Sequence, residues 1–137
     1  HDSNICYFLE PDLRARRMWS GAHRFPVFWE DDVNWATGRD FRFDEDDRRA
    51  FSTPGLKIID IHPTHYAFNT ASAEQYGKVA STMTSATARD VERHRFEGPG
   101  TRDYVGNLIG FAKDAGIRIL SMHEMIDHQM DHYEAAA

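Results

Sequence analysis

Short apolar runs alternate along the chain with segments of helical periodicity. Three runs are rich in aliphatic, β-branched or aromatic residues and stop at polar ones, which is typical of buried parallel strands. These predicted strands cover residues 24–32, 55–63 and 117–122. Predicted helices cover residues 10–21, 44–51, 69–83, 98–116 and 123–136, and residues 87–96 form a polar helix or turn. The remainder of 34–54 is polar and irregular.

This order of elements predicts an α/β protein. Each predicted strand is followed by a helix or loop, and a strand–helix–strand order is the natural arrangement of parallel strands joined by helical crossovers. Three strands make a small sheet, so we expect part of a (β/α) barrel rather than a closed one. Residues 1–137 are expected to form a single domain.

Composition and charge narrow the possible functions. The 137 residues are 41% hydrophobic and 12% aromatic, which predicts a folded chain. The net charge of −6 and the scattered basic residues argue against nucleic-acid binding. No apolar run is long enough to span a membrane. Cys6 is the only cysteine, so no internal disulfide forms, which fits a cytoplasmic location. The chain does not begin with methionine, so we expect a longer protein upstream.

Residues capable of acid–base chemistry follow all three predicted strands. Sites in parallel α/β proteins gather at the carboxyl ends of the strands, so we expect these residues to converge. Carboxylates and imidazoles together could bind a metal ion or exchange protons. The candidates are Glu30, Asp31 and Asp32 after the first strand, Asp60, His62 and His65 after the second, and His123 and Glu124 after the third.

The second group carries the sharpest hypothesis. Asp60 precedes His62 by two residues, so on a strand both point to one face. A carboxylate partner raises the pKa of a histidine and keeps it protonated, as a general acid needs. His65 follows Pro63 and is expected to turn away and serve the loop. The alternatives are a polar pair satisfied in the core and a metal pair made by His62 and His65.

The other candidates have structural explanations that are about as good. The acids of residues 30–32 could be a solvated loop or a helix cap. Trp29 could stack on a sugar ring or pack in the core, and His123 with Glu124 could begin a helix. The chain contains no G-x-S-x-G motif, phosphate-binding loop or dinucleotide fingerprint.

Several stretches resemble a known family. "HDSNI", "FPVFWEDD", "GLKIIDIHPTHYAFNT" with the following Tyr76, and "GPGTRDYVGNLIGFAKDAGI" occur in the order found in the C-terminal half of polysaccharide deacetylases of the NodB-homology group. The WbmS-like branch of that group is the most similar. The resemblance implies a distorted, TIM-like (β/α)7 barrel, of which this chain is an incomplete part.

The resemblance also implies an activity. Such enzymes remove N-acetyl groups from an amino sugar or polysaccharide, with a divalent metal such as zinc held by one Asp and two His. A second Asp is the base, and a late His is the acid. By this resemblance His62 is the acid with Asp60 beside it. The groove is then lined by residues 29–32, that is Trp29, Glu30, Asp31 and Asp32, together with His65 and Asn69.

The resemblance places the metal ligands upstream of this chain. "HPTH" is one residue shorter than the H-x-x-x-H metal pair, and the order of the motifs fits the later position. The expected partners are a carbohydrate and the N-terminal half of the barrel, on the same polypeptide or on another one. The alternatives are a non-catalytic module that binds a carbohydrate or a protein partner, and an independent metal site built on His62 and His65 with a nearby Asp.

Overall fold

A computed structural model describes residues 16–17, 19–81 and 83–127. In chain order its strands and helices are β1 Arg16–Arg17, β2 His23–Arg24, β3 Trp29–Glu30, α1 Asp31–Ala36, α2 Glu45–Ser52, β4 Ile59–Asp60, α3 Pro63–Phe68, α4 Ala73–Ala80, the 3₁₀ turn η2 Met83–Ser85, α5 Ala88–His94 and α6 Thr101–Asp114. Residues 122–127 are also helical. None of the helices in these ranges is long and apolar enough to cross a membrane.

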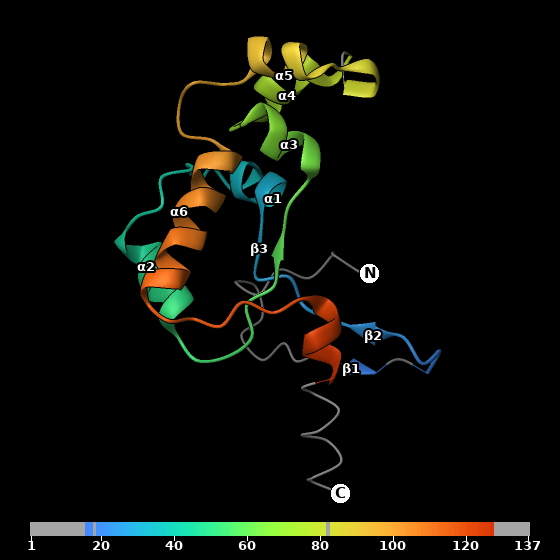
Figure 1. Cartoon of the computed structure of the whole chain (residues 1–137), viewed down its shortest axis with the longest axis vertical. Coiled ribbons are helices and arrows are strands. Elements are labelled where there is room, and N and C mark those ends of the chain that lie inside the picture. Colours follow the sequence, from blue (N-terminus) through green and yellow to red (C-terminus); the bar gives the residue numbers. More distant parts are fainter. Residues whose placement is uncertain (1–15, 18, 82, 128–137) are drawn as a thin grey trace, which may run out of the picture.

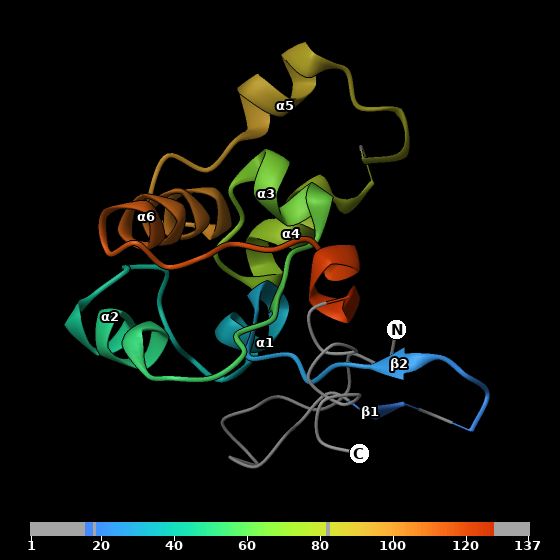
Figure 2. The ribbon, with the colours of Figure 1, turned by 60° about the horizontal axis from the view of Figure 1, so that its bottom comes forward.

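A two-stranded parallel sheet lies at the centre of the molecule. β3 pairs with β4, with Trp29 opposite Ile59 and Glu30 opposite Asp60. Helices α3, α4 and α5 gather at one end, beyond the carboxyl ends of these strands, and the β1–β2 hairpin lies at the other end (Figures 1 and 2). The mixed α/β class and the parallel pairing are confirmed, whereas membership of a barrel stays a prediction.

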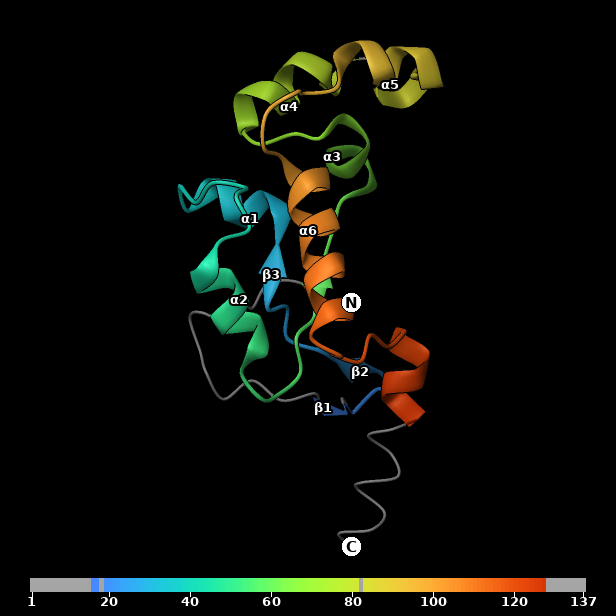
Figure 3. The ribbon, with the colours of Figure 1, turned by 60° about the vertical axis from the view of Figure 1, so that its left-hand side comes forward.

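The hydrophobic core fills the space between β3, α2 and α6, which lie next to one another (Figure 3). Trp29 stacks on Tyr104 with ring centroids 4.6 Å apart, and Phe41 packs edge-on to both rings. The Tyr104 hydroxyl donates to Asp47 Oδ1 at 2.9 Å, and Arg39 pairs with the same oxygen. The buried phenol is therefore satisfied, which holds α6 against α2.

Local signals explain most of the helices. Asp44 caps α2 and forms a reciprocal capping box with Asp47, so the predicted helix at 44–51 is confirmed. Ser72 caps α4 and Thr87 caps α5. In α6 Gly100 is the cap position and Thr101 is the first helical residue. Its hydroxyl donates to Thr70 O at 2.8 Å, which ties the helix start to the chain after α3.

Two predicted elements are wrong. The helix at 10–21 fails over its described part, because residues 16–17 pair antiparallel with 23–24 and Gly21 takes a positive φ of 83° in the connecting turn. The strand at 117–122 is absent, since residues 117–121 have no regular structure. An extended segment becomes a strand only when another strand pairs with it, and the described residues offer none there.

The two other predicted strands are present but short. Residues 24–32 contribute Arg24 to β2 and Trp29–Glu30 to β3, and α1 begins at Asp31. Residues 55–63 contribute only Ile59–Asp60, because Pro63 occupies the first position of α3. Proline suits that position, since it lacks the N–H that would be unpaired there. The helix predicted at 123–136 is present up to residue 127 and then lies outside the described residues.

Candidate functional site

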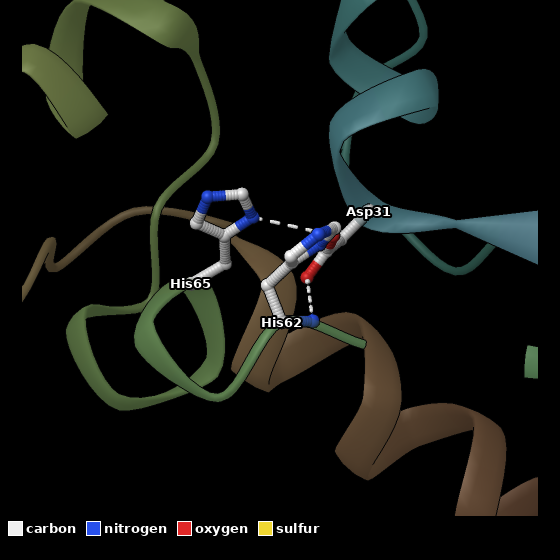
Figure 4. A group of neighbouring side chains, drawn as sticks. All are labelled: Asp31, His62 and His65. Carbon is white, nitrogen blue, oxygen red and sulfur yellow. Dashed lines mark hydrogen bonds and ion pairs between the residues drawn. The ribbon is translucent and has the colours of Figure 1, made fainter. Parts of the chain in front are cut away.

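The parallel pairing of β3 and β4 brings two helix starts together. α1 begins at Asp31, directly after β3. α3 begins at Pro63 and is separated from β4 by two residues. Because the strands run in the same direction, these helix starts both lie at the carboxyl end of the sheet (Figure 1). Asp31, His62 and His65 therefore meet although the first is 31 residues from the second (Figure 4).

Asp31 is the centre of this group and is fully buried. Its Oδ2 accepts a hydrogen bond from the backbone N–H of His62 at 3.0 Å, and its Oδ1 accepts one from the N–H of Asp32 at 2.9 Å. The two backbone donors hold the carboxylate in one orientation. His62 Nδ1 lies 2.7 Å from Oδ1, a short distance typical of a charge-assisted hydrogen bond.

His65 approaches the same oxygen from the other side. Its Nδ1 lies 3.2 Å from Asp31 Oδ1, but the geometry makes no hydrogen bond, and this buried nitrogen has no other hydrogen-bond partner. The ring packs against Trp35 and edge-on to Tyr76, with centroids 4.5 and 5.0 Å away. The expectation that His65 turns away toward the loop is therefore wrong.

These contacts shift the pKa values of both His62 and Asp31. The hydrogen bond with Asp31 raises the pKa of His62 above its ordinary 6.5, and it outweighs the opposing effect of burial. Burial by itself would raise the pKa of Asp31, but its contacts with the His65 and His62 rings lower it below 3.8. An imidazolium beside a carboxylate is therefore the favoured state of this pair at neutral pH.

Three further carboxylates surround the pair. Burial, helped by the charges of Asp32 and Asp60, raises the pKa of Glu30 to about 7. Asp60 also raises the pKa of His62 electrostatically, but less than Asp31 does. Asp31, which the sequence did not single out as the partner of His62, is thus the carboxylate that hydrogen-bonds the ring. The parallel register explains why, since it places Asp60 beside Glu30.

Two groups in the described residues could hold a metal ion. Asp31, His62 and His65 offer ligand atoms within 4.8 Å of one another, and so do Glu30, Asp32 and His62. One carboxylate and two imidazoles are a common donor set for zinc. The first group therefore fits a divalent ion for two reasons. Its donor atoms are of the right chemistry, and the buried Nδ1 of His65 makes no hydrogen bond.

The remaining predicted residues have other surroundings. Trp29 is buried in the core, where its Nε1 donates to Asn34. Asn69 is buried in a left-handed conformation at the end of α3, and its amide binds the carbonyls of Phe96 and Gly98 and a carboxylate oxygen of Asp103. Both residues are thus engaged in structural contacts. His123 and Glu124 are exposed on the final helical segment, outside the group around Asp31.

Comparisons with known proteins bear on this site. The sequence profile of the WbmS-like polysaccharide deacetylases matches residues 1–80, which include Asp31, His62 and His65. No curated protein matches the chain.

A solved structure is also similar. It is a polysaccharide deacetylase assigned to O-antigen biosynthesis, WbmS from Bordetella bronchiseptica. The TM-score is 0.59 at 26% sequence identity, over 80% of this chain. The chain spans 45% of the length of that protein. Since the profile covers more than half of the chain, and the solved structure agrees with it, this chain belongs to the WbmS-like polysaccharide deacetylase family.

Proposed function

We propose that this chain supplies the acid side of a metal-dependent polysaccharide deacetylase. In this role it takes part in removing an N-acetyl group from an amino sugar. The observation that carries the proposal is the bond between His62 Nδ1 and the buried carboxylate of Asp31, at the edge of the sheet where α/β enzymes place their sites. Membership of the family and the similarity to WbmS support the reaction class.

His62 is the proton donor. With Nδ1 bound to Asp31, the nitrogen that meets the substrate is Nε2, and the side chain is 43% exposed. Breaking an amide bond needs a proton on the leaving nitrogen, and a positioned imidazolium delivers it. Asp31 keeps the ring charged and fixes its tautomer, as a carboxylate does for a catalytic histidine elsewhere. Asp31 is thus a positioning residue.

A divalent metal, with zinc the best candidate, would polarise the amide carbonyl and activate water when bound. The motif order of the family assigns its ligands for that metal to the part of the barrel upstream of this chain. The chain's own residues then hold and deliver the proton. Glu30, Asp32 and Asp60 add carboxylates beside His62 that can accept hydrogen bonds from sugar hydroxyl groups.

The partners follow from this role. The carbohydrate substrate binds along the edge formed by Glu30, Asp32 and His62, and the upstream half of the barrel completes the site. That half lies on the same polypeptide or on a second one. We place the reaction in the cytoplasm, where sugar precursors of cell-surface polysaccharides are made available to biosynthetic enzymes.

The test is His62→Gln in the whole protein, with His94→Gln as control. His94 is exposed on α5 and takes no part in the group around Asp31. Loss of the acid should lower kcat for acetate release by roughly 10²–10⁴-fold, with the metal held by the upstream part of the protein still bound. The control should keep full activity. Equal activity of both variants would overturn the role of His62, and oligosaccharide binding without acetate release would favour a non-catalytic module.

A further inference from the structure

The buried Nδ1 of His65 has a charge contact with Asp31 but no hydrogen bond, and the proposed reaction does not explain this. The side chain is 6% exposed, and its Nδ1 faces Asp31 Oδ1 without making a hydrogen bond. Burying a polar nitrogen without a partner costs free energy, and native proteins seldom leave one so. A ligand between the ring and the carboxylate would remove this cost.

The distances fit a small cation. Asp31 Oδ1 lies 2.7 Å from His62 Nδ1 and 3.2 Å from His65 Nδ1. Ligand bonds of about 2.0–2.1 Å in a tetrahedral site put neighbouring ligand atoms about 3.3 Å apart. The separation between Asp31 Oδ1 and His65 Nδ1 is therefore close to that value, whereas His62 Nδ1 lies about 0.6 Å too near the same oxygen. Binding an ion requires the half-buried His62 ring to move away from the carboxylate, and all three ligand atoms already lie within 4.8 Å of one another (Figure 4).

The surroundings already hold two of the ligands in place. Backbone N–H groups of Asp32 and His62 fix the Asp31 carboxylate, and Trp35 with Tyr76 pack around the His65 ring. Outer contacts of this kind orient the ligands in metal sites. Asp32 and Asp60 add negative charge near the His62 ring, which favours a bound cation.

We propose that Asp31, His62 and His65 form a transition-metal site of this chain, separate from the metal that the family's reaction uses. Two imidazoles and one carboxylate select zinc, cobalt, nickel or copper rather than magnesium or calcium. Three protein ligands leave a fourth position for water. The site stands whether or not the proposed function is correct.

One consequence does rest on the proposed function. A metal on His62 Nδ1 occupies the nitrogen that Asp31 holds protonated, so the acid and metal-bound states exclude each other. Zinc beyond the amount needed for the reaction would then inhibit deacetylation. The rate of deacetylation would then fall as the concentration of free zinc rises and the site fills.

The test is a titration of the metal-free chain with Co²⁺, whose visible bands report four-coordinate binding. We expect one Co²⁺ per chain, displaced by Zn²⁺ and unaffected by excess Mg²⁺. His65→Gln and His62→Gln should each weaken binding by more than the roughly 10–100-fold that loss of an outer contact costs. His94→Gln should bind like the unchanged chain. Circular dichroism of the metal-free variants checks that each is folded, and the exposed position of His62 makes its exchange tolerable.

The outcomes separate this inference from the proposed function. Binding that survives both histidine exchanges would show an adventitious ion only and would overturn the site. Absence of any Co²⁺ spectrum would also overturn it, even if His62→Gln abolishes deacetylation in the whole protein. Specific Co²⁺ binding by a whole protein that releases no acetate would overturn the proposed function but would support the metal site. In an active whole protein, His65→Gln should remove inhibition by excess zinc.

Discussion

At the scale of single residues, one oxygen of Asp31 organises the site. It faces the Nδ1 atoms of both His62 and His65, while two backbone N–H groups hold the carboxylate still. Asp60, two residues before His62, acts on the ring only through its charge and does so more weakly. The contact geometry therefore favours Asp31 over Asp60, the partner that spacing along the chain predicts.

This difference predicts unequal effects of removing the two charges. Asp31→Asn replaces the carboxylate that accepts from His62, so the ring loses its proton more readily and its orientation is no longer fixed. We expect kcat of the whole protein to fall by roughly 10²–10⁴-fold. Asp60→Asn should cost less, because the charge of Asp60 acts on the His62 ring more weakly than the hydrogen bond with Asp31 does. A pH profile of kcat checks this, since the limb set by the acid should move to lower pH in Asp31→Asn. Equal effects would contradict the assignment.

The same pair should appear in the pH dependence of stability. The folded pKa of His62 is raised above 6.5, so its contribution is fully present below about pH 6.5 and is lost as the pH rises through the folded value. The folded pKa of Asp31 is lowered, so its contribution is present above about pH 3.8 and is lost as the pH falls through the folded value. The pair therefore stabilises most between these limits.

Urea unfolding in EDTA at pH 5.5 and pH 8.5 measures this. The free energy of unfolding should be lowered more by His62→Gln at pH 5.5 than at pH 8.5. The effect should be modest, since the His62 ring is partly solvated. His94→Gln is the control and should show no such pH dependence. A larger loss at pH 8.5 would contradict the direction of the His62 shift.

At the scale of elements, the join between α3 and α6 supports the site from behind. Asn69 ends α3 in a left-handed conformation, and its Oδ1 accepts from the backbone N–H groups of Arg102 and Asp103 at the start of α6. Gly100 lies directly against it, because a Cβ at that position would overlap the carbonyl oxygen of Asn69. The close approach lets α6 begin beside the helix that carries His65.

Gly100→Ala should therefore destabilise the protein. The added methyl meets backbone rather than a flexible side chain, and overpacking of this kind typically costs about 1–3 kcal/mol. Gly106→Ala is the matched control, because it lies within the same helix with open space around it. There alanine should stabilise by about 0.5–1 kcal/mol. Thermal unfolding of the two variants gives the measurement, and a change of the same sign and size in both would show that the close approach to Asn69 is not what Gly100 provides.

The elements also show what could be predicted from the sequence. Asp44 with Asp47 caps α2 and Ser72 caps α4, so these starts were readable from neighbouring residues. The extended run at 117–122 was not, because a strand depends on a partner elsewhere in the chain. Likewise, His62 was a sound candidate from its place after a strand. Its pairing with Asp31 could not be predicted from the sequence, since it depends on the register of β3 against β4.

At the scale of the whole molecule, the central sheet is small for the helices around it. Each strand of the β3–β4 pair has one edge with no strand beside it in the described part of the chain. Unpaired sheet edges invite another strand. The chain spans 45% of the length of the solved relative. We propose that the remaining part of such a protein supplies strands for these two edges.

Exposed apolar side chains give this a testable form. Ile119 is 62% exposed, and three further apolar residues nearby in the chain are also exposed, namely Ile109 in α6, Ile117 after it and Met122 at the start of the final helical segment. Apolar surface of this extent favours association. We expect the isolated chain to sediment above its monomer mass at micromolar concentration, and Ile119→Lys to shift it toward monomer. Trp19→Lys, in the turn of the β1–β2 hairpin, is the control for unspecific adhesion. A monomer with cooperative two-state unfolding would contradict the need for a further part of the barrel. An equal shift by both variants would show that the surface after α6 is not the site of contact.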